Sequence, residues 1–280
     1  MIIFKQAKQL TQHLEQQRKN DKKTGFVPTM GALHKGHLSL IEASKPANGL
    51  TVCSIFVNPT QFNNPEDFKH YPITIEKDIE QLITAGCDIL FLPPVEEIYP
   101  PGHEKKQFDL GAIENRLEGF YRPGHFQGVC EVVDKMLEII NPDNLYMGQK
   151  DFQQCMVVKK LLELTGKDER IRLNIIPTMR EADGLAMSSR NLRLNSAEKN
   201  TATAIYKELA LIKANFHSQP FDQLKQSAKV HLEDKGFVVD YVEIANRNDL
   251  APALNSDEPC VALIAATLGQ IRLIDNLLLN

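Results

Sequence analysis

Gly25-Phe26-Val27-Pro28-Thr29-Met30-Gly31-Ala32-Leu33-His34-Lys35-Gly36-His37 leads directly into Leu38-Ser39-Leu40-Ile41-Glu42-Ala43. The first three residues form a short apolar run, which predicts a buried strand that ends at Val27 and enters a loop at Pro28. Residues 38–43 have the character of a helix. A strand, a polar loop and a helix in this order are the repeating unit of parallel α/β sheets, so this stretch sets the expected fold class.

The same unit recurs further along the chain. Short β-rich runs that predict strands lie at 51–57, 87–92, 144–147 and 172–176. Stretches with helical spacing lie at 74–85, 129–140 and 152–164. Short apolar strands that alternate with helices indicate a parallel sheet covered by helices on both faces.

The pattern changes after residue 176. Two long helical stretches, 197–214 and 221–235, are followed by β-rich segments at 237–245, 260–268 and 271–278. Helices followed by strands indicate a second, smaller α+β domain. We place the boundary near Pro177, which divides the chain into domains of residues 1–176 and 177–280.

Composition limits the classes of function. The 280 residues are 42% hydrophobic and 24% charged, which is typical of a globular protein with a sizeable core. Lys plus Arg number 32 against 36 Asp plus Glu, giving a net charge of -4. This balance argues against a nucleic-acid partner, although a local positive pocket for a nucleotide is compatible with it.

The cysteines and apolar segments point to a cytoplasmic protein. Five cysteines are scattered without a Cys-x-x-Cys pair, which favours reduced thiols over disulfides or a zinc site. The first six residues lack the apolar stretch of a signal peptide, and the apolar run 261–268 is too short to span a membrane. We expect no membrane partner.

The pair His34 and His37 is the sharpest candidate for chemistry. A helix that begins near these residues offers unpaired backbone N–H groups and a partial positive charge, both of which favour phosphate. Histidines three residues apart lie on one side of a helix, and each can donate a ring N–H. Gly36 lets a nucleotide approach the backbone. Two alternatives stay open at this point: histidines that only cap the helix, and a metal site, for which no third ligand has an obvious spacing.

Three further loops carry polar groups suited to a nucleotide or a small acid. Ser188, Ser189 and Arg190 lie in a Gly-containing loop and suit terminal phosphates, although a turn or a helix cap explains them equally well. Lys150 offers a compact positive charge between a strand and a helix; its alternatives are a solvated lysine, a capping Asp151 and an exposed Gln154. Asn58 and Gln61 offer amides that can bind hydroxyl and carboxylate groups, or they form only a turn.

Together these segments resemble the pantothenate synthetase family. The similar motifs occur in the family's order at 28–37, 56–62, 117–119, 122–126, 150–154 and 183–191. The likeness spans nearly the whole chain, and several long motifs in order are far more specific than one histidine pair. The chain has Gln149 where the family often has Glu, Ile73 where it often has Arg, and Glu131 where Thr is common.

The resemblance implies a fold, an activity and partners. It implies a Rossmann-like nucleotidyltransferase domain with a smaller C-terminal lid domain, and a cytoplasmic homodimer that uses Mg²⁺ and ATP. The implied reaction joins (R)-pantoate to β-alanine through a pantoyl adenylate, releasing AMP and diphosphate. Since the pantoate carboxylate is already ionised, catalysis requires alignment and charge stabilisation rather than a general base.

The resemblance also assigns residues to roles. The ATP-binding residues it implies are Met30, Gly31, Ala32, Leu33, His34, Lys35, Gly36, His37, Gly148, Gln149, Lys150, Asp151, Met179, Met187, Ser188, Ser189 and Arg190. Gln61 and Gln154 are expected to bind pantoate, and we expect Asn58 to bind substrate with them. His37 matches the family's presumed proton donor, but we favour an electrostatic role for it, shared with His34 and Lys150.

Two other classes of function remain as alternatives. One is another His-x-Gly-His nucleotidylyltransferase, which transfers AMP to a phosphate acceptor and needs no amine. The other is a non-catalytic nucleotide-binding protein, which would release no pyrophosphate with any acceptor. A tRNA synthetase is disfavoured because the sequence shows no anticodon-binding domain or basic surface.

Overall fold

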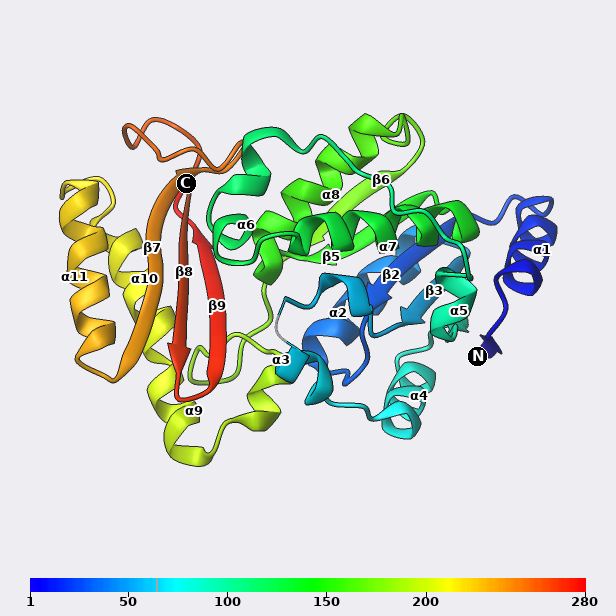
Figure 1. Cartoon of the computed structure of the whole chain (residues 1–280), viewed down its shortest axis with the longest axis horizontal. Coiled ribbons are helices and arrows are strands. Elements are labelled where there is room, and N and C mark those ends of the chain that lie inside the picture. Colours follow the sequence, from blue (N-terminus) through cyan, green and yellow to red (C-terminus); the bar gives the residue numbers. More distant parts are fainter. Residues whose placement is uncertain (64) are drawn as a thin grey trace.

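A computed structural model describes residues 1–63 and 65–280 and shows two sheets side by side (Figure 1). The larger sheet has six strands in the order β1-β4-β3-β2-β5-β6, and every neighbouring pair is parallel. Its strands are β1 Ile2–Phe4, β2 Thr24–Thr29, β3 Leu50–Ile55, β4 Ile89–Phe91, β5 Asn144–Gly148 and β6 Arg172–Ile176. The predicted α/β class with a parallel sheet is confirmed.

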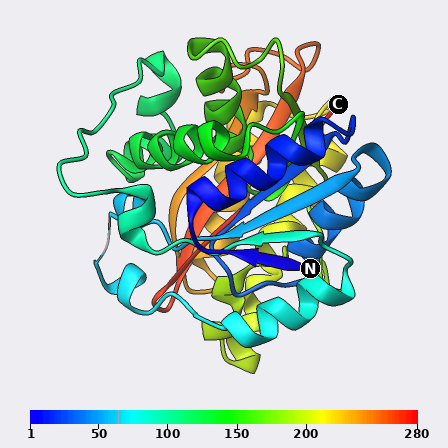
Figure 2. The same ribbon diagram turned by 90° about the vertical axis from the view of Figure 1, so that its right-hand side faces the viewer.

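Helices cover both faces of this sheet because successive strand residues point to opposite sides. Phe26 packs with α1 Ala7–Arg18, α7 His125–Ile140 and α8 Phe152–Leu164 on one face. Its neighbour Val27 packs with α2 Lys35–Ser44 and α4 Ile75–Thr84 on the other face. Figure 2 shows α1 and α7 on one side of the strands and α4 on the other.

The smaller sheet is antiparallel and belongs to the C-terminal region. It contains β7 Phe237–Asn246, β8 Cys260–Leu268 and β9 Ile271–Leu278 in that order. The helices of this region are α9 Ser196–Ala202, α10 Ala204–Asn215 and α11 Phe221–Glu233. They form a separate core with one face of the sheet, while Leu263 and Ala245 on the sheet pack against Phe152 of α8.

Short helical segments connect the main elements. The α-helical ones are α3 Pro65–Lys69, α5 Val95–Ile98 and α6 Glu118–Tyr121. The 3-10 segments are η1 Lys45–Ala47, η2 Pro59–Gln61, η3 Gly111–Asn115, η4 Gln149–Asp151 and η5 Ser189–Arg193. Several of these follow the carboxyl ends of strands, where they carry the polar residues singled out above.

Most predicted elements are confirmed, and the differences have local causes. The prediction that the strand ends at Val27 was wrong, because β2 continues through Pro28, whose restricted φ fits extended backbone. The single helix expected at 197–214 is two helices divided at Thr203. The hydroxyl of Thr203 donates to the Asn200 carbonyl at 2.7 Å, a local bond that competes with continued helix.

The cysteines and the helix lengths bear on two expectations from the sequence. Each of the five cysteines is buried, and none forms a disulfide within the described residues. Across 1–63 and 65–280, the helices are all too short or too polar to cross a membrane. The division into domains at Pro177 stays a prediction; β6 ends at the preceding residue, Ile176.

Candidate active site

The four predicted motifs meet because they follow neighbouring strands. In the order β3-β2-β5-β6, the strands are followed by the loops that carry Gln61, His34, Lys150 and Met179. The carboxyl ends of parallel strands lie at one edge of the sheet. From β2 the chain continues to β3 on one side and later to β5 on the other, so the strand order changes direction at β2. Ligands bind at such a switch point in parallel α/β sheets. A cavity of about 240 Å³ opens there.

The structure brings most of the predicted residues into this cavity. The ones that line it are Met30, His34, Gly36, His37, Asn58, Gln61, Gly148, Lys150, Asp151, Gln154, Met179, Met187, Ser188, Ser189 and Arg190. Predicted residues outside its lining are Gly31, Ala32, Leu33, Lys35 and Gln149. The last five belong to the same loops, so any role for them is through the backbone or through their neighbours.

His34 and His37 cap α2 reciprocally. The Nδ1 of His34 accepts from the Gly36 N–H at 3.1 Å, and the Nδ1 of His37 accepts from the His34 N–H at 3.3 Å. The rings lie with centroids 4.0 Å apart. An Nδ1 that accepts a hydrogen bond places the ring proton on Nε2. Capping and ligand binding are therefore compatible, because each ring keeps one donor for a phosphate oxygen.

Both histidines are held neutral. Burial, reinforced by the positive charge of Lys150, lowers the pKa of His34 to about 4. Burial, together with His34 and Lys150, lowers the pKa of His37 well below its usual value. A neutral imidazole donates a hydrogen bond but carries no surplus proton, which favours charge stabilisation over proton donation by His37.

The loop before the histidines is held by a residue that the sequence did not reveal. Asp78 on α4 is fully buried, and its carboxylate accepts from the backbone N–H groups of Ala32 and Leu33 at 2.9 and 2.8 Å. Ala32 has a positive φ of 48°, a strained conformation for a residue with a side chain. Asp78 stabilises this turn. A Cβ at Gly36 would lie 2.9 Å from the His34 ring, so the glycine makes room for the cap.

Gln61 is positioned by a buried polar cluster. Asn58 is only 1% exposed, and its Nδ2 donates to Gln61 Oε1 at 3.1 Å and to the Gly128 carbonyl at 3.0 Å. The Asn58 Oδ1 accepts from the Tyr99 hydroxyl at 2.9 Å. His125 Nδ1 lies 2.8 Å from the Gln61 carbonyl. These contacts use the hydrogen-bonding capacity of Asn58 within the protein, which favours an indirect role, through Gln61, for a residue we expected to contact substrate.

Lys150 projects from a loop that the second sheet secures. Its side chain is 18% exposed, and its ammonium lies 3.4 Å from Asp151 Oδ1. Asn276 on β9 donates to the carbonyl oxygens of Gln149 and Lys150. Gln149 Nε2 donates in return to Asn276 Oδ1 at 3.2 Å. The departure at Gln149 therefore has a partner, since a glutamate there would face an acceptor oxygen.

The segment from Met187 to Arg190 is anchored to the larger sheet's loops. Ser189 is buried, and its hydroxyl donates to the Ala32 carbonyl at 2.9 Å. Arg190 donates to Asp67 Oδ2 at 2.7 Å. Ser188 Oγ accepts from the Arg190 N–H at 3.3 Å and caps η5. Among Ser188, Ser189 and Arg190, Ser188 is the one whose side chain has no hydrogen bond to another segment within residues 1–63 and 65–280.

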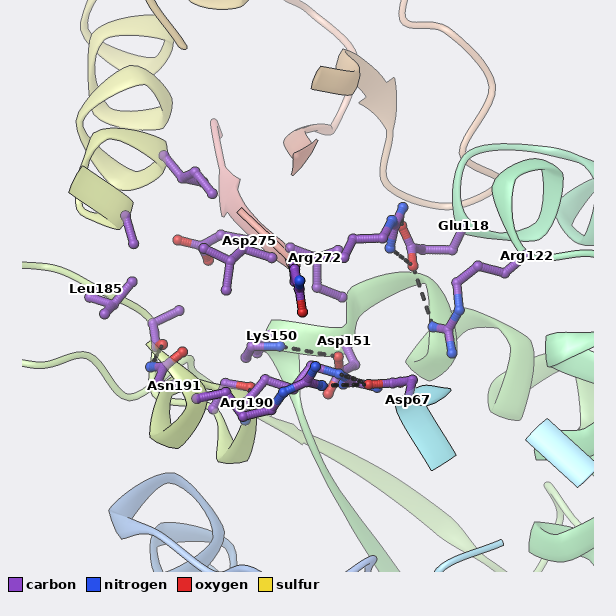
Figure 3. A pocket seen from close by; sticks show the side chains of 18 of the residues that line it. Asp67, Glu118, Arg122, Lys150, Asp151, Leu185, Arg190, Asn191, Arg272 and Asp275 are labelled. Carbon is purple, nitrogen blue, oxygen red and sulfur yellow. Dashed lines mark hydrogen bonds and ion pairs between the residues drawn. The ribbon is translucent and has the colours of Figure 1, made fainter. Parts of the chain in front are cut away.

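A second, wider cavity of about 550 Å³ adjoins the first (Figure 3). The residues that line both are Glu118, Arg122, Lys150, Asp151, Ser188, Arg190, Ile274 and Asp275. Burial opposes ionisation of Glu118, but two hydrogen bonds from Arg272 lower the pKa of this carboxyl to about 2. The Tyr241 hydroxyl also donates to it, at 2.9 Å. Glu118 on α6 is thereby tied to β7 and β9 across the cleft.

The other departures from the family's usual residues lie away from both cavities. Glu131 is buried and bonds His103 Nε2 at 2.7 Å, which fixes the segment after α5 onto α7. The Ile73 side chain is 73% exposed. Within 1–63 and 65–280, no cluster of three or more His, Cys, Asp or Glu side chains forms a metal site.

Known proteins resemble this chain in sequence. A sequence model of the pantoate–beta-alanine ligase family matches residues 2–278. Pantothenate synthetases from Alteromonas mediterranea and Cytophaga hutchinsonii are each 43% identical, and the alignments cover 99% and 100% of this chain and 99% of each relative.

Solved structures give the same result. The crystal structure of pantothenate synthetase from Thermus thermophilus superposes with a TM-score of 0.93 at 35% identity, covering 100% of this chain and 99% of that one. The structure of a pantoate–beta-alanine ligase from Francisella tularensis, complexed with beta-gamma ATP and beta-alanine, superposes with a TM-score of 0.84 at 38% identity. The alignment covers 99% of this chain and 97% of that one. The chain belongs to the pantoate–beta-alanine ligase family.

Proposed function

We propose that this enzyme condenses (R)-pantoate with β-alanine in two steps, using ATP and passing through enzyme-bound pantoyl adenylate. The observation that carries the proposal is the cavity itself, in which neutral His34 and His37, Lys150 and the amide of Gln61 line one space. The histidines and Lys150 suit phosphate oxygens, while Gln61 and Gln154 suit the hydroxyl groups of pantoate.

In the first step, a pantoate carboxylate oxygen attacks the α-phosphorus of ATP, and the bond to the departing diphosphate breaks. No proton needs to be removed, because the carboxylate is already ionised. Negative charge moves to the diphosphate, and the Nε2–H groups of His34 and His37 with the Lys150 ammonium stabilise it. Ser188 and the backbone of 30–37 and 148–151 complete the proposed ATP site, with Met179 and Met187 along the adenosine.

In the second step, the neutral amine of β-alanine attacks the acyl carbon of the adenylate. The bond to the AMP oxygen breaks, AMP leaves with the electron pair, and the proton released by the amine passes to solvent. Joining the carboxylate to AMP makes this possible, since a free carboxylate has no good leaving group. The second cavity gives the amine a route to the acyl carbon, because the two cavities share Lys150 and Asp151.

Mg²⁺ is proposed to arrive with the ATP phosphates. Asp151 and Ser188 line both cavities and carry the hard oxygen donors that Mg²⁺ accepts. When bound, the ion would neutralise phosphate charge. A cytoplasmic location, a homodimer and a closing C-terminal lid stay predictions; a stable monomer in light scattering at micromolar concentration would contradict the dimer.

Isotope exchange tests the function directly. With ATP, Mg²⁺ and pantoate alone, labelled diphosphate should enter ATP, because the first step is reversible while the adenylate stays bound. β-Alanine should be needed only for steady AMP release. A strict requirement for β-alanine would contradict the adenylate route. Exchange with a phosphorylated acceptor in place of pantoate would instead indicate the dinucleotide-forming class.

A further inference from the structure

Arg122 is a largely buried arginine with one weak partner. It follows α6, and its Nη1 lies 3.5 Å from Glu118 Oε2, at the limit of a hydrogen bond. Its side chain is 22% exposed. Its other side-chain N–H groups meet no hydrogen-bond acceptor in residues 1–63 and 65–280. A guanidinium that lines a cavity and has unused N–H donors is suited to bind an anionic ligand.

The two carboxylates near Arg122 are committed to other arginines. Glu118 accepts two hydrogen bonds from Arg272, at 2.7 and 2.8 Å. Asp67 accepts from Arg190 at 2.7 Å and from Arg193 at 3.1 Å. Figure 3 shows Arg122 extending between Glu118 and Asp67. Carboxylates therefore lie beside Arg122, but in the part of the chain that the structure describes none of them forms a close ion pair with it.

The ion pairs around Arg122 contain one more positive charge than negative charges. Asp67, Glu118 and Asp240 supply three negative charges, and Arg122, Arg190, Arg193 and Arg272 supply four positive ones, so the excess is one. Glu66 at the rim is 67% exposed, and water screens its charge.

The pKa shifts agree on which arginine is in excess. Burial lowers the pKa of Arg272, but its hydrogen bonds to Glu118 more than reverse this. For Arg122, burial lowers the pKa and the weak contact with Glu118 does not compensate.

Arg122 lies at the pantoate end of the site. Its carbonyl accepts the His125 N–H at 3.1 Å, and His125 in turn bonds the Gln61 carbonyl. Its side chain lines both the narrow cavity with Gln61 and the wide cavity beside it. The free guanidinium is therefore close to the acyl group of a bound adenylate and open to the space from which an amine would enter.

We propose that Arg122 binds the carboxylate of β-alanine and so selects an amine that carries an acid group. This inference rests on the function proposed above. The phosphates of ATP have His34, His37 and Lys150, and the pantoate carboxylate is consumed in the first step. The remaining anionic group of the substrates is the unreactive carboxylate of β-alanine. A planar guanidinium can bind it with two parallel hydrogen bonds.

The test separates the two half-reactions in the full-length enzyme. Arg122→Ala should raise KM for β-alanine roughly 10- to 100-fold, the loss expected for a charged hydrogen-bonded contact. Exchange of diphosphate into ATP with pantoate alone should change less than about threefold, within the scatter of surface effects. Hydroxylamine, a small uncharged amine, should capture the adenylate as a hydroxamate equally well in both proteins. Arg122→Lys should show an intermediate KM for β-alanine, since lysine keeps the positive charge but lacks the two parallel N–H donors of the guanidinium.

Two comparisons make the result specific. Arg193→Ala removes a guanidinium from the same wide cavity and should leave KM for β-alanine near its original value. The amide of β-alanine, which lacks the negative charge, should be a poor acceptor whose KM is insensitive to Arg122→Ala. An unchanged KM for β-alanine, or a parallel loss of exchange in both Arg122 variants, overturns the inference. No pantoate-dependent exchange in the unsubstituted enzyme would instead contradict the proposed function.

Discussion

Asn276 on β9 donates its Nδ2–H groups to the backbone carbonyls of Lys150 at 2.8 Å and Gln149 at 2.9 Å. The side chain is 2% exposed, so these bonds form away from bulk water. The last strand of the small sheet therefore fixes the loop that follows β5 of the large sheet. The position of the Lys150 ammonium depends on a residue more than a hundred positions away in the sequence.

Asn276→Ala should lower the rate of ATP–diphosphate exchange about tenfold. The substitution leaves two buried carbonyls without donors, and a small shift of Lys150 would weaken the charge stabilisation that we propose for the first step. The measurement is kcat and KM for exchange, and kcat should carry the change. Asn276→Asp, nearly the same size but without the donors, should behave similarly. Loss of stability with unchanged kcat would limit Asn276 to a structural role.

Asp78→Asn should destabilise the fold and the histidine loop together. The Asp78 carboxylate accepts backbone N–H groups from Ala32 and Leu33 with both oxygens. The asparagine amide has one acceptor oxygen, so its NH2 group would face one of the two backbone N–H donors. We expect a loss of about 1.5–3 kcal/mol in the free energy of unfolding, measured by urea titration. Glu76→Gln, an exposed change on the same helix, should have an effect near zero.

The pH dependence distinguishes a neutral His37 from a proton donor. The folded pKa of His34 is lowered to about 4, and that of His37 is also lowered, so both rings are neutral above pH 6. The value of kcat/KM for ATP in exchange, which reports the free enzyme, should be level between pH 6 and 8. A decline above an apparent pKa near 6.5 would instead show that an imidazolium is required.

The same pKa shifts reduce stability in acid. A histidine whose folded pKa is lowered binds its proton more readily when unfolded. The contribution of such a histidine to folding stability is fully present above about pH 6.5. It is lost as the pH falls toward the folded pKa, which is about 4 for His34 and about 3 for His125. The free energy of unfolding should therefore fall between pH 6.5 and 4. His125→Gln should make that slope shallower in urea titrations at several pH values.

Asp67 should control how firmly the Ser188–Arg190 segment is held. Asp67 bonds both Arg190 and Arg193, which joins α3 to η5 across the mouth of the cleft. Asp67→Asn should speed backbone hydrogen exchange in 188–193, because the charge that holds the arginines is removed. Saturating Mg-ATP should slow exchange in the same segment of the original protein. Unchanged exchange with Mg-ATP would count against a closing lid.

Local patterns in the sequence predicted strands β2 to β6 and helices α2, α4, α7 and α8, but they did not predict β1 or α1. Residues 172–176 and 152–164 match β6 and α8, because a short apolar run and a helical spacing leave little ambiguity there. The start of α2 was placed three residues late. The reason is that a histidine is an unusual cap, and its reciprocal bonds depend on the tertiary environment that keeps both rings neutral.

The motifs of the candidate site could be recognised in the sequence, but the residues that support them could not. His34, Gln61 and Lys150 follow strands that become neighbours, so position in the chain was informative. Asp78 and Asn276 gave no comparable signal. An aspartate in an amphipathic helix is ordinarily solvated, and an asparagine in a β-rich segment resembles a strand end. Their roles come from contacts between distant segments, which a pattern in one sequence does not encode.

Lys150→Ala should separate the two half-reactions most clearly. Lys150 lines both cavities, and its charge acts on His34. In the proposed mechanism, charge builds on the phosphates beside it during the first step. Removing it should reduce ATP–diphosphate exchange by roughly 10²-fold or more, the usual loss for one stabilising donor. In the second step the reacting carbon is already activated, and AMP leaves with less change in phosphate charge. Synthetic pantoyl adenylate with β-alanine should therefore turn over within about tenfold of the original rate. Lys159→Ala, an exposed lysine on α8, removes the same charge from the molecule and should affect neither step. Equal losses in both half-reactions would mean that Lys150 shapes the site as a whole rather than stabilising the first transition state.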